Sequence, residues 1–263
     1  MTGHIQCERC ERIQILRFNR PEKKNAITTD MYGALADGLR AGDADPAVAV
    51  QLFAGTEGVF TAGNDLTDFL AMAEGGDFDP SAFEFMRALA TAEKPLVAAV
   101  DGLAVGIGTT MLLHCDLVYA SGEARFMTPF LNLGLVPEAA SSLLAPARMG
   151  SPAAFALLCA GETFDAERAL AAGLINAVVP AGELETTARE AALSLAAKPA
   201  AALAAARQLM HGDRSAILKR IDEEVALFKV HLRSAEAREA FAAFREKRDP
   251  DFEKLRKQAE RAQ

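Results

Sequence analysis

The chain has 263 residues, of which 51% are hydrophobic and 24% are charged, and its formal net charge is −8. Acidic and basic residues are interspersed without a basic block, which argues against nucleic acid as the main partner because phosphate neutralisation needs clustered Lys and Arg. No apolar run approaches the roughly 20 residues that span a bilayer, and the N-terminus lacks the features of a secretory signal. We therefore expect a globular, cytoplasmic protein without a membrane partner.

The first half of the chain alternates predicted strands and helices. RIQILRFN (12–19) predicts a first strand, and TTDMYGALADGLRAGDADP (28–46) predicts a helix with a Thr/Asp start and a Gly/Pro stop. AVAVQLFAG (47–55) and PLVAAVDG (95–102) predict strands buried on both faces, because their apolar residues run without alternation. A glycine-rich loop with a short helix and then a longer helix (81–95) separate them. A glycine-led helix (106–115) and two short strands (116–121 and 124–129) follow.

From residue 138 onward the pattern becomes mainly helical. Residues 138–161 and 165–173 predict helices, and INAVVP (175–180) is the last predicted strand. From Leu184 to the end, Ala-rich stripes predict four amphipathic helices with breaks near residues 198–199, 211–212 and 233–234. Strands that alternate with helices favour mostly parallel sheets. We expect a core over residues 1–197 and a helical region over 198–263 that joins subunits.

Several common chemistries lack their usual motifs in this sequence. The pair Cys7 and Cys10 would need further ligands to hold zinc, and no second pair follows, so we predict free thiols and no metal site. GLAVGIGTTM has Met111 where the dinucleotide fingerprint requires its third glycine. His114 lies in an apolar stretch and is predicted to be a satisfied core residue. Nucleotide-dependent chemistry and serine hydrolysis are therefore not indicated.

Two segments rich in small residues precede predicted helices. FTAGNDL (60–66) and DGLAVGIGTT (101–110) can each present backbone N–H groups that no side chain obstructs. Two such donors converging on one oxygen would form an oxyanion hole. Alternatively, the glycines only permit tight turns, and either segment alone leaves that alternative open.

Together with NRPEKKNAI (19–27) and FMTPFLNLGLVPEAASS (126–142), these segments resemble the enoyl-CoA hydratase/isomerase superfamily. FDAERALAAGLINAVVP (164–180) and FREKRDPDF (244–252) resemble its C-terminal half. The resemblance implies an α/β fold of the crotonase type, a spiral of ββα repeats with two near-perpendicular sheets and a C-terminal helical region. It also implies a homotrimer or hexamer that acts on an acyl-CoA thioester, with coenzyme A as part of the substrate and no separate cofactor.

The resemblance also implies roles for individual residues. The backbone amides of Asn64 and Ile107 match the oxyanion-hole positions, and Glu138 matches the catalytic carboxylate of the Δ3,Δ2-enoyl-CoA isomerases. Lys23 and Lys24 are candidates to meet the phosphates of coenzyme A. The substrate-binding positions that it implies are Lys24, Ala26, Ala62, Gly63, Asp65, Leu66, Gly106, Gly108, Thr110, Phe130 and Leu133.

The position of the carboxylate distinguishes the reactions of this family. Hydratases resembling this chain carry two glutamates that activate water, and those positions are Thr110 and Phe130 here, so hydration by the usual mechanism is not expected. Glu138 is the single ionisable residue of LNLGLVPEAASS (131–142), and apolar surroundings raise the pKa of a glutamate and strengthen it as a base. We predict that Glu138 shifts the double bond of a 3-enoyl-CoA. Fatty-acid β-oxidation is the natural pathway for this reaction, and the breakdown of aromatic or branched acyl-CoA, which uses similar proteins, is left open.

Three alternatives to this reaction remain open. Glu138 could instead be a favourable partner for the dipole of a helix that begins there. The scaffold could support another reaction, such as hydration, thioester hydrolysis or decarboxylation of an acyl-CoA, or serve as a non-catalytic acyl-CoA-binding protein. The carboxylates of Asp65, Asp101 and Asp116 are expected in structural roles, as caps or in turns.

Overall fold

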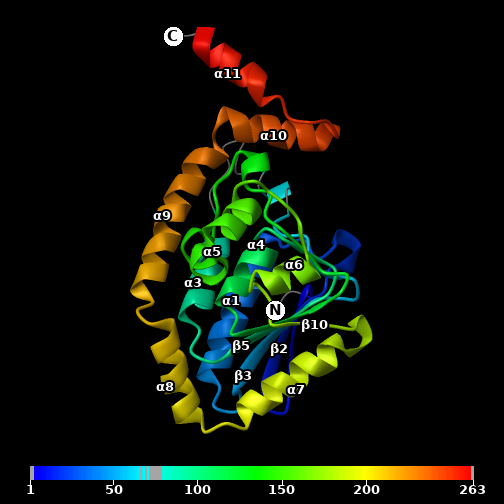
Figure 1. The fold of residues 1–263 in the computed structure, drawn as a ribbon, viewed down its shortest axis with the longest axis vertical. Coiled ribbons are helices and arrows are strands. Elements are labelled where there is room, and N and C mark those ends of the chain that lie inside the picture. Colours follow the sequence, from blue (N-terminus) through cyan, green and yellow to red (C-terminus); the bar gives the residue numbers. More distant parts are fainter. Residues whose placement is uncertain (1–2, 66, 69, 71–78, 262–263) are drawn as a thin grey trace.

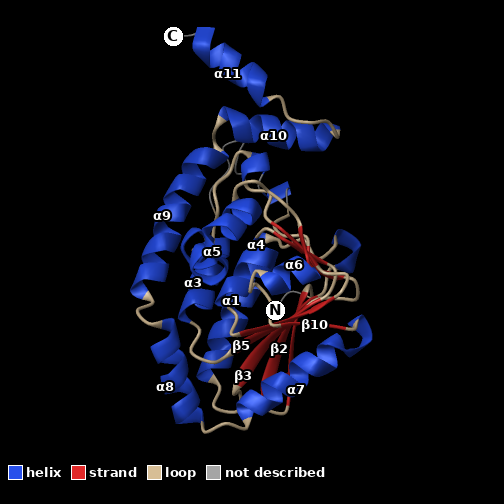
Figure 2. Ribbon diagram, viewed as in Figure 1, coloured by secondary structure: helices blue, strands red, loops and turns tan. Residues whose placement is uncertain are grey.

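The structure is a computed structural model that describes residues 3–65, 67–68, 70 and 79–261. Its larger sheet, drawn in red in Figure 2, has an antiparallel pair at one edge and parallel neighbours elsewhere. The order of its strands is β1 (Ile5–Cys10), β2 (Ile13–Phe18), β3 (Val50–Ala54), β5 (Leu96–Val100), β7 (Leu117–Ser121) and β10 (Ala177–Val179). Every residue of β3 and of β5 is buried, as their continuous apolar runs predict.

A smaller sheet follows the order β4 (Val59–Thr61), β6 (Leu103–Val105), β8 (Arg125–Met127) and β9 (Phe164–Asp165). The first three of these strands are parallel, and β9 is antiparallel to β8. Three successive pairs along the chain, β3–β4, β5–β6 and β7–β8, each place the first strand in the larger sheet and the second in the smaller one. This repeated step between two sheets, with helical segments between the pairs, confirms the predicted α/β class and its strand–strand–helix repeats.

Helices cover both faces of the larger sheet (Figure 1). On one face, α1 (Thr29–Ala44) and α3 (Ser81–Thr91) pack their apolar sides into the main core. The N-cap of α1 is Thr28, whose side chain accepts a hydrogen bond from the Met31 amide. On the other face, α7 (Leu184–Ala196) buries four small or aliphatic side chains at helical spacing against β2, β3 and β5. Burial of apolar side chains on both faces stabilises the sheet by about 1.5–3 kcal/mol for each large side chain.

The last helices of the chain form the C-terminal region. In Figure 1, α8 (Ala200–His211) and α9 (Ser215–Leu232) run along one side of the molecule, and α10 (Ala235–Glu246) and α11 (Phe252–Arg261) extend beyond the rest. The rings of Phe83 in α3 and Phe228 in α9 lie 6.4 Å apart, so the C-terminal region shares the main core. Earlier in the chain lie the helices α4 (Ile107–Thr110), α5 (Ser141–Leu158) and α6 (Ala166–Ala171).

Several expectations about the elements are corrected by the structure. The strand β1 precedes the first predicted strand, and the three-residue strand β4 occupies a segment predicted as a glycine-rich loop. The three-residue strand β6 lies between the strand predicted over 95–102 and the helix predicted from 106, where no separate element was assigned. Over the described residues from 184 to 261 there are five helices instead of four, because Lys247 is left-handed and Pro250 cannot continue α10. The helix predicted from residue 138 begins only at Ser141, because Ala139 and Ala140 have positive φ.

Candidate active site

The first candidate loop follows β4 and packs against the segment after β2. The Ile27 amide donates to the Gly63 carbonyl at 2.8 Å, and the Asp65 amide donates to the Ile27 carbonyl at 2.9 Å. Gly63 has a φ of 80°, and a Cβ built on it would lie 2.6 Å from the carbonyl oxygen of Val105. Only glycine fits here, because a side chain would collide with the neighbouring backbone.

The second candidate loop joins β6 to α4. Gly106 has φ 56° and ψ −119°, a conformation that glycine adopts readily, and it leads directly into Ile107. Because Gly63 contacts Val105, the two loops lie side by side. In the described part of the chain, neither the Asn64 amide nor the Ile107 amide donates a hydrogen bond. The structure thus places the two loops that carry these amides beside each other.

A cavity of about 670 Å³ opens beside these loops, within the size range of ligand sites. The predicted site residues in its wall are Lys24, Ala26, Ala62, Gly63, Asn64, Asp65, Gly106, Phe130 and Leu133. As far as this wall is described, it does not include Ile107, Gly108, Thr110 or Glu138. The remaining predicted residue, Leu66, lies outside the described residues.

Basic side chains gather around this cavity. Arg20 donates to the Asp65 carboxylate at 2.6 Å, so Asp65 holds the first loop in place, as its predicted structural role requires. Arg248 also lines the cavity and is paired with acidic residues of α10. Lys23 and Lys24 are exposed at the same cavity. Arg20 and Arg248 were not among the predicted site residues, although they lie in the segments NRPEKKNAI (19–27) and FREKRDPDF (244–252) that carry the resemblance.

Glu138 is a buried carboxylate. Its exposed fraction is 3%, and among the described residues its Oε1 atom has no hydrogen-bond partner. Burial raises the pKa of Glu138 to about 8, and the negative charge of Glu224 adds to this effect. A glutamate with a pKa near neutrality can act both as a base and, once protonated, as an acid. This arrangement suits proton transfer.

Tyr32 of α1 contacts the first loop. Its hydroxyl donates a hydrogen bond to the side-chain oxygen of Asn64. The pKa of Tyr32 is raised well above its ordinary value by burial and then by the charge of Glu138. The charge of Glu138 therefore acts on a hydroxyl that contacts the first loop. No sequence pattern indicated Tyr32, which occupies an ordinary core position of an amphipathic helix.

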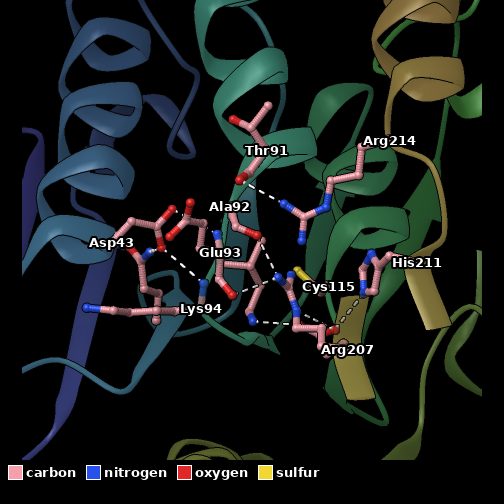
Figure 3. Close-up of polar contacts among 12 residues, drawn as sticks. Asp43, Thr91, Ala92, Glu93, Lys94, Cys115, Arg207, His211 and Arg214 are labelled. Atoms are coloured by element: carbon pink, nitrogen blue, oxygen red, sulfur yellow. Dashed lines mark hydrogen bonds and ion pairs between the residues drawn. The ribbon is translucent and has the colours of Figure 1, made fainter. Parts of the chain in front are cut away.

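A second cavity, of about 440 Å³, includes Asp116, Arg207 and His211 in its wall. Figure 3 shows Arg207 and His211 of α8 among the residues that surround the turn at Ala92. The Arg207 Nε atom lies 2.9 Å from both carboxylate oxygens of Asp116, and His211 Nε2 lies 2.9 Å from one of them. Asp116 also accepts a hydrogen bond from the Leu96 amide at 2.8 Å. This network fixes α8 to β5 and confirms the structural role predicted for Asp116.

Two other predicted structural residues are also satisfied. Asp101 accepts a hydrogen bond from the Gly58 amide at 2.7 Å. His114 is 5% exposed, and its Nε2 atom lies 2.7 Å from the carbonyl oxygen of Ala139. Both predictions are confirmed.

The four cysteines are free, as predicted. Cys7 packs toward the main core and Cys10 toward the cluster beneath α7, so the two thiols face opposite sides of the larger sheet and cannot share a ligand. Among the described residues, no group of three or more His, Cys, Asp and Glu could hold a metal ion. None of the helices in the described part of the chain has the length and apolarity needed to cross a membrane.

Comparisons with known proteins agree with this geometry. The sequence model of the family described as enoyl-CoA hydratase/isomerase matches residues 8–256. Enoyl-CoA delta isomerase 2 of Rattus norvegicus is 37% identical over 215 residues, which cover 80% of this chain and 54% of that protein. The 2,3-dehydroadipyl-CoA hydratase of Escherichia coli (strain K12) is 30% identical over 245 residues, which cover 93% of this chain and 96% of that hydratase.

The fold is also shared with solved structures. The crystal structure of an enoyl-CoA hydratase/isomerase from Pseudoalteromonas atlantica T6c matches with a TM-score of 0.90 at 40% identity, covering 95% of this chain and all of the other. The chain spans about half the length of the rat isomerase and nearly all of the bacterial hydratase. It belongs to the enoyl-CoA hydratase/isomerase family and is an acyl-CoA enzyme with the crotonase fold.

Proposed function

We propose that the protein is a Δ3,Δ2-enoyl-CoA isomerase, which converts a 3-enoyl-CoA into the trans-2-enoyl-CoA. The observation that carries this proposal is the state of Glu138, a buried carboxylate with an unpartnered Oε1 atom and a pKa of about 8. Its charge acts on Tyr32, whose hydroxyl donates a hydrogen bond to Asn64, and this supports a place for the acid beside the first loop.

The proposed reaction moves one proton over two carbon atoms. Glu138 removes a proton from carbon 2, and the electrons of that C–H bond pass toward the thioester carbonyl to give an enolate. The amides of Asn64 and Ile107 donate to the enolate oxygen, and each donor in such a site contributes about 3 kcal/mol of transition-state stabilisation. The protonated Glu138 then returns the proton to carbon 4 while the double bond forms between carbons 2 and 3. No atom is gained or lost.

The surroundings of Glu138 favour isomerisation over hydration. By the sequence resemblance, a hydratase would carry its two glutamates at positions 110 and 130. This chain has Thr110 and Phe130 there, and neither side chain can act as a general base. Phe130, Leu133 and Leu135 give the cavity an apolar wall. An apolar wall disfavours an ordered water that could attack the double bond.

The basic side chains and exposed apolar residues suggest the proposed partners. The exposed Lys23 and Lys24 can bind phosphates of coenzyme A at the cavity. The C-terminal helices expose large apolar side chains, including Leu209 at 85% and Met210 at 87%. Such residues are typical of surfaces that other subunits cover, which supports the proposed homotrimer or hexamer.

The proposal is tested by giving the protein two substrates in parallel. With a 3-enoyl-CoA we expect ultraviolet absorbance of the conjugated 2-enoyl thioester to appear, whereas a 2-enoyl-CoA in water should keep its absorbance. Hydration of the 2-enoyl-CoA without isomerisation of the 3-enoyl-CoA would replace the proposal with a hydratase. Release of free coenzyme A would indicate thioester hydrolysis, and binding without turnover would indicate a binding protein.

A further inference from the structure

The turn that carries Glu138 has an unfavourable backbone conformation. Ala139 has a φ of 59° and Ala140 a φ of 55°, so two consecutive residues with a Cβ atom occupy the left-handed region. This conformation is disfavoured for alanine and persists only where surrounding contacts impose it. The helix α5 follows at once, and its N-cap, Ala140, has no side chain that could cap the helix. Other parts of the chain must therefore hold the turn.

Glu224 of α9 supplies these contacts from a distant part of the sequence. Its Oε2 atom accepts a hydrogen bond from the Ala140 amide at 2.6 Å. Its Oε1 atom accepts from the Ser142 amide at 3.1 Å and from the Ser142 hydroxyl at 2.5 Å. The buried carboxylate thus satisfies two amides at the start of α5, where a helix N-terminus favours negative charge.

His114 holds the other side of the turn. Its Nε2 atom lies 2.7 Å from the Ala139 carbonyl oxygen and must donate, because a carbonyl can only accept. Burial lowers the pKa of His114 to about 4, so the imidazole is neutral near pH 7 and carries its proton on Nε2. The two left-handed residues are therefore held by side chains from two elements that are far apart in sequence.

The position of Glu224 within α9 is unusual for a charged residue. It is 5% exposed and lies in helical register with Ile221 and Phe228, which are buried in the core. The preceding acids, Asp222 and Glu223, are exposed and form ion pairs with basic residues at the surface. A buried carboxylate is costly, and removing it leaves its partners unsatisfied, so it is retained where its geometry is needed.

We propose that Glu224, assisted by His114, is the positioning residue for the catalytic base. It holds Ala139 and Ala140 in the left-handed conformation, and the turn from Glu138 to Ser142 then keeps the Glu138 carboxylate buried. The inference rests on the proposed function, because it assigns Glu138 as the base. It adds a residue that is not part of the cavity wall as described.

The proposal has a consequence for the titration of Glu138. Among the described residues, the charge of Glu224 of α9 acts on Glu138, and the charge of Glu138 acts on Tyr32 of α1. Arg220 lies beside Glu224 and donates to the Ser142 hydroxyl at 3.1 Å. The negative charge of Glu224 disfavours ionisation of Glu138. Removing that charge lowers the pKa of Glu138, and loosening the turn acts in the same direction by admitting water.

The test compares Glu224→Gln with Asp222→Asn, which removes one carboxylate from the exposed side of the same helix. Steady-state isomerisation of a 3-enoyl-CoA is measured across pH, together with the Kd of a saturated acyl-CoA. We expect Glu224→Gln to lower kcat about 10- to 100-fold, the usual effect of a misplaced catalytic group, while KM and Kd stay within about twofold. Its rate–pH midpoint should move to lower pH, and Asp222→Asn should behave as wild type.

An infrared titration makes the inference independent of turnover. The carboxyl band of Glu138 is assigned by its loss in Glu138→Gln, and its midpoint is followed in wild type, in Glu224→Gln and in Ser142→Ala. If wild type does not isomerise a 3-enoyl-CoA, the proposed function fails, but a lowered midpoint in Ser142→Ala, which removes a hydrogen bond of the turn and keeps the Glu224 charge, still supports the positioning role. A midpoint that is lowered in Glu224→Gln and unmoved in Ser142→Ala reports the lost charge alone and overturns that role. If Glu224→Gln does not fold, Ser142→Ala removes one donor to Glu224 and should lower kcat several-fold, and wild-type kcat in that variant overturns the inference.

Discussion

Replacement of Glu138 by glutamine should abolish isomerisation and at the same time stabilise the folded chain at high pH. The pKa of Glu138 is about 8 in the folded chain, against an ordinary value of 4.5. An unfolded chain therefore ionises this group near pH 4.5, whereas the folded chain resists ionisation until about pH 8. Because the folded state binds more protons between these values, the wild type loses stability as the pH rises through this window.

The size of this loss follows from the two pKa values. One pH unit between the two pKa values is worth about 1.4 kcal/mol. The raised pKa of Glu138 therefore lowers the free energy of unfolding by about 3 kcal/mol at pH 7 and by on the order of 4–5 kcal/mol above pH 8. Glutamine has no such cost. The stability of Glu138→Gln relative to wild type should therefore grow by on the order of 4 kcal/mol between pH 5 and pH 9, or roughly 10 °C in Tm.

The assay is urea or thermal denaturation of wild type, Glu138→Gln and the control Glu190→Gln at pH 5 and pH 9. Glu190 is an exposed glutamate of α7, so its replacement should change stability little and equally at both pH values. Turnover of a 3-enoyl-CoA by Glu138→Gln should fall to background while the Kd of a saturated acyl-CoA is retained. A stability difference that does not change with pH would refute the reasoning, since it would mean that Glu138 ionises normally in the folded chain.

Three further predictions concern the pH profile and the two loops. Because the base must be ionised, kcat/KM should rise about tenfold per pH unit below the Glu138 pKa of about 8 and level off above it, as a rate–pH series would record. Gly63→Ala should destabilise the chain by about 1–3 kcal/mol and lower kcat, because the new Cβ would lie 2.6 Å from the Val105 carbonyl oxygen. The control is Gly58→Ala, which also has a positive φ but no such contact and should keep wild-type kcat in the same assay. Lys24→Ala should raise KM several-fold at low ionic strength and much less in 1 M salt, and equal effects in both would exclude a phosphate contact.

The sequence predicted the elements whose pattern is strong and missed those whose pattern is weak. The strands β3 and β5 are entirely apolar and were recognised, because only buried strands combine such length with such composition. The edge strand β1 reads IQCERC and exposes alternate polar residues, and β4 and β6 have three residues each, too few for a periodic signal. Their existence depends on pairing with distant strands, which a local pattern does not contain.

The candidate site divides in the same way. The glycines at positions 63 and 106 could be identified from composition, but their contact follows from the parallel pairing of β4 and β6. Glu138 was singled out by its apolar neighbours in sequence, and its burial confirms that reading of its environment. Glu224 was missed among three consecutive acids, although it is the one in register with Ile221 and Phe228. A carboxylate at a core position of an amphipathic helix is therefore a signal that a sequence can offer.

The central claim is that one carboxylate carries the proton from carbon 2 to carbon 4. It is tested most directly with a 3-enoyl-CoA that carries deuterium at both positions of carbon 2, converted in ordinary water and analysed by NMR at carbon 4 of the product. Because Glu138 is 3% exposed and its Oε1 atom has no partner among the described residues, exchange with solvent should be slow. We predict that part of the deuterium lost from carbon 2 reappears at carbon 4, whereas product formed at the full rate with no deuterium at carbon 4 would contradict a single-carboxylate mechanism.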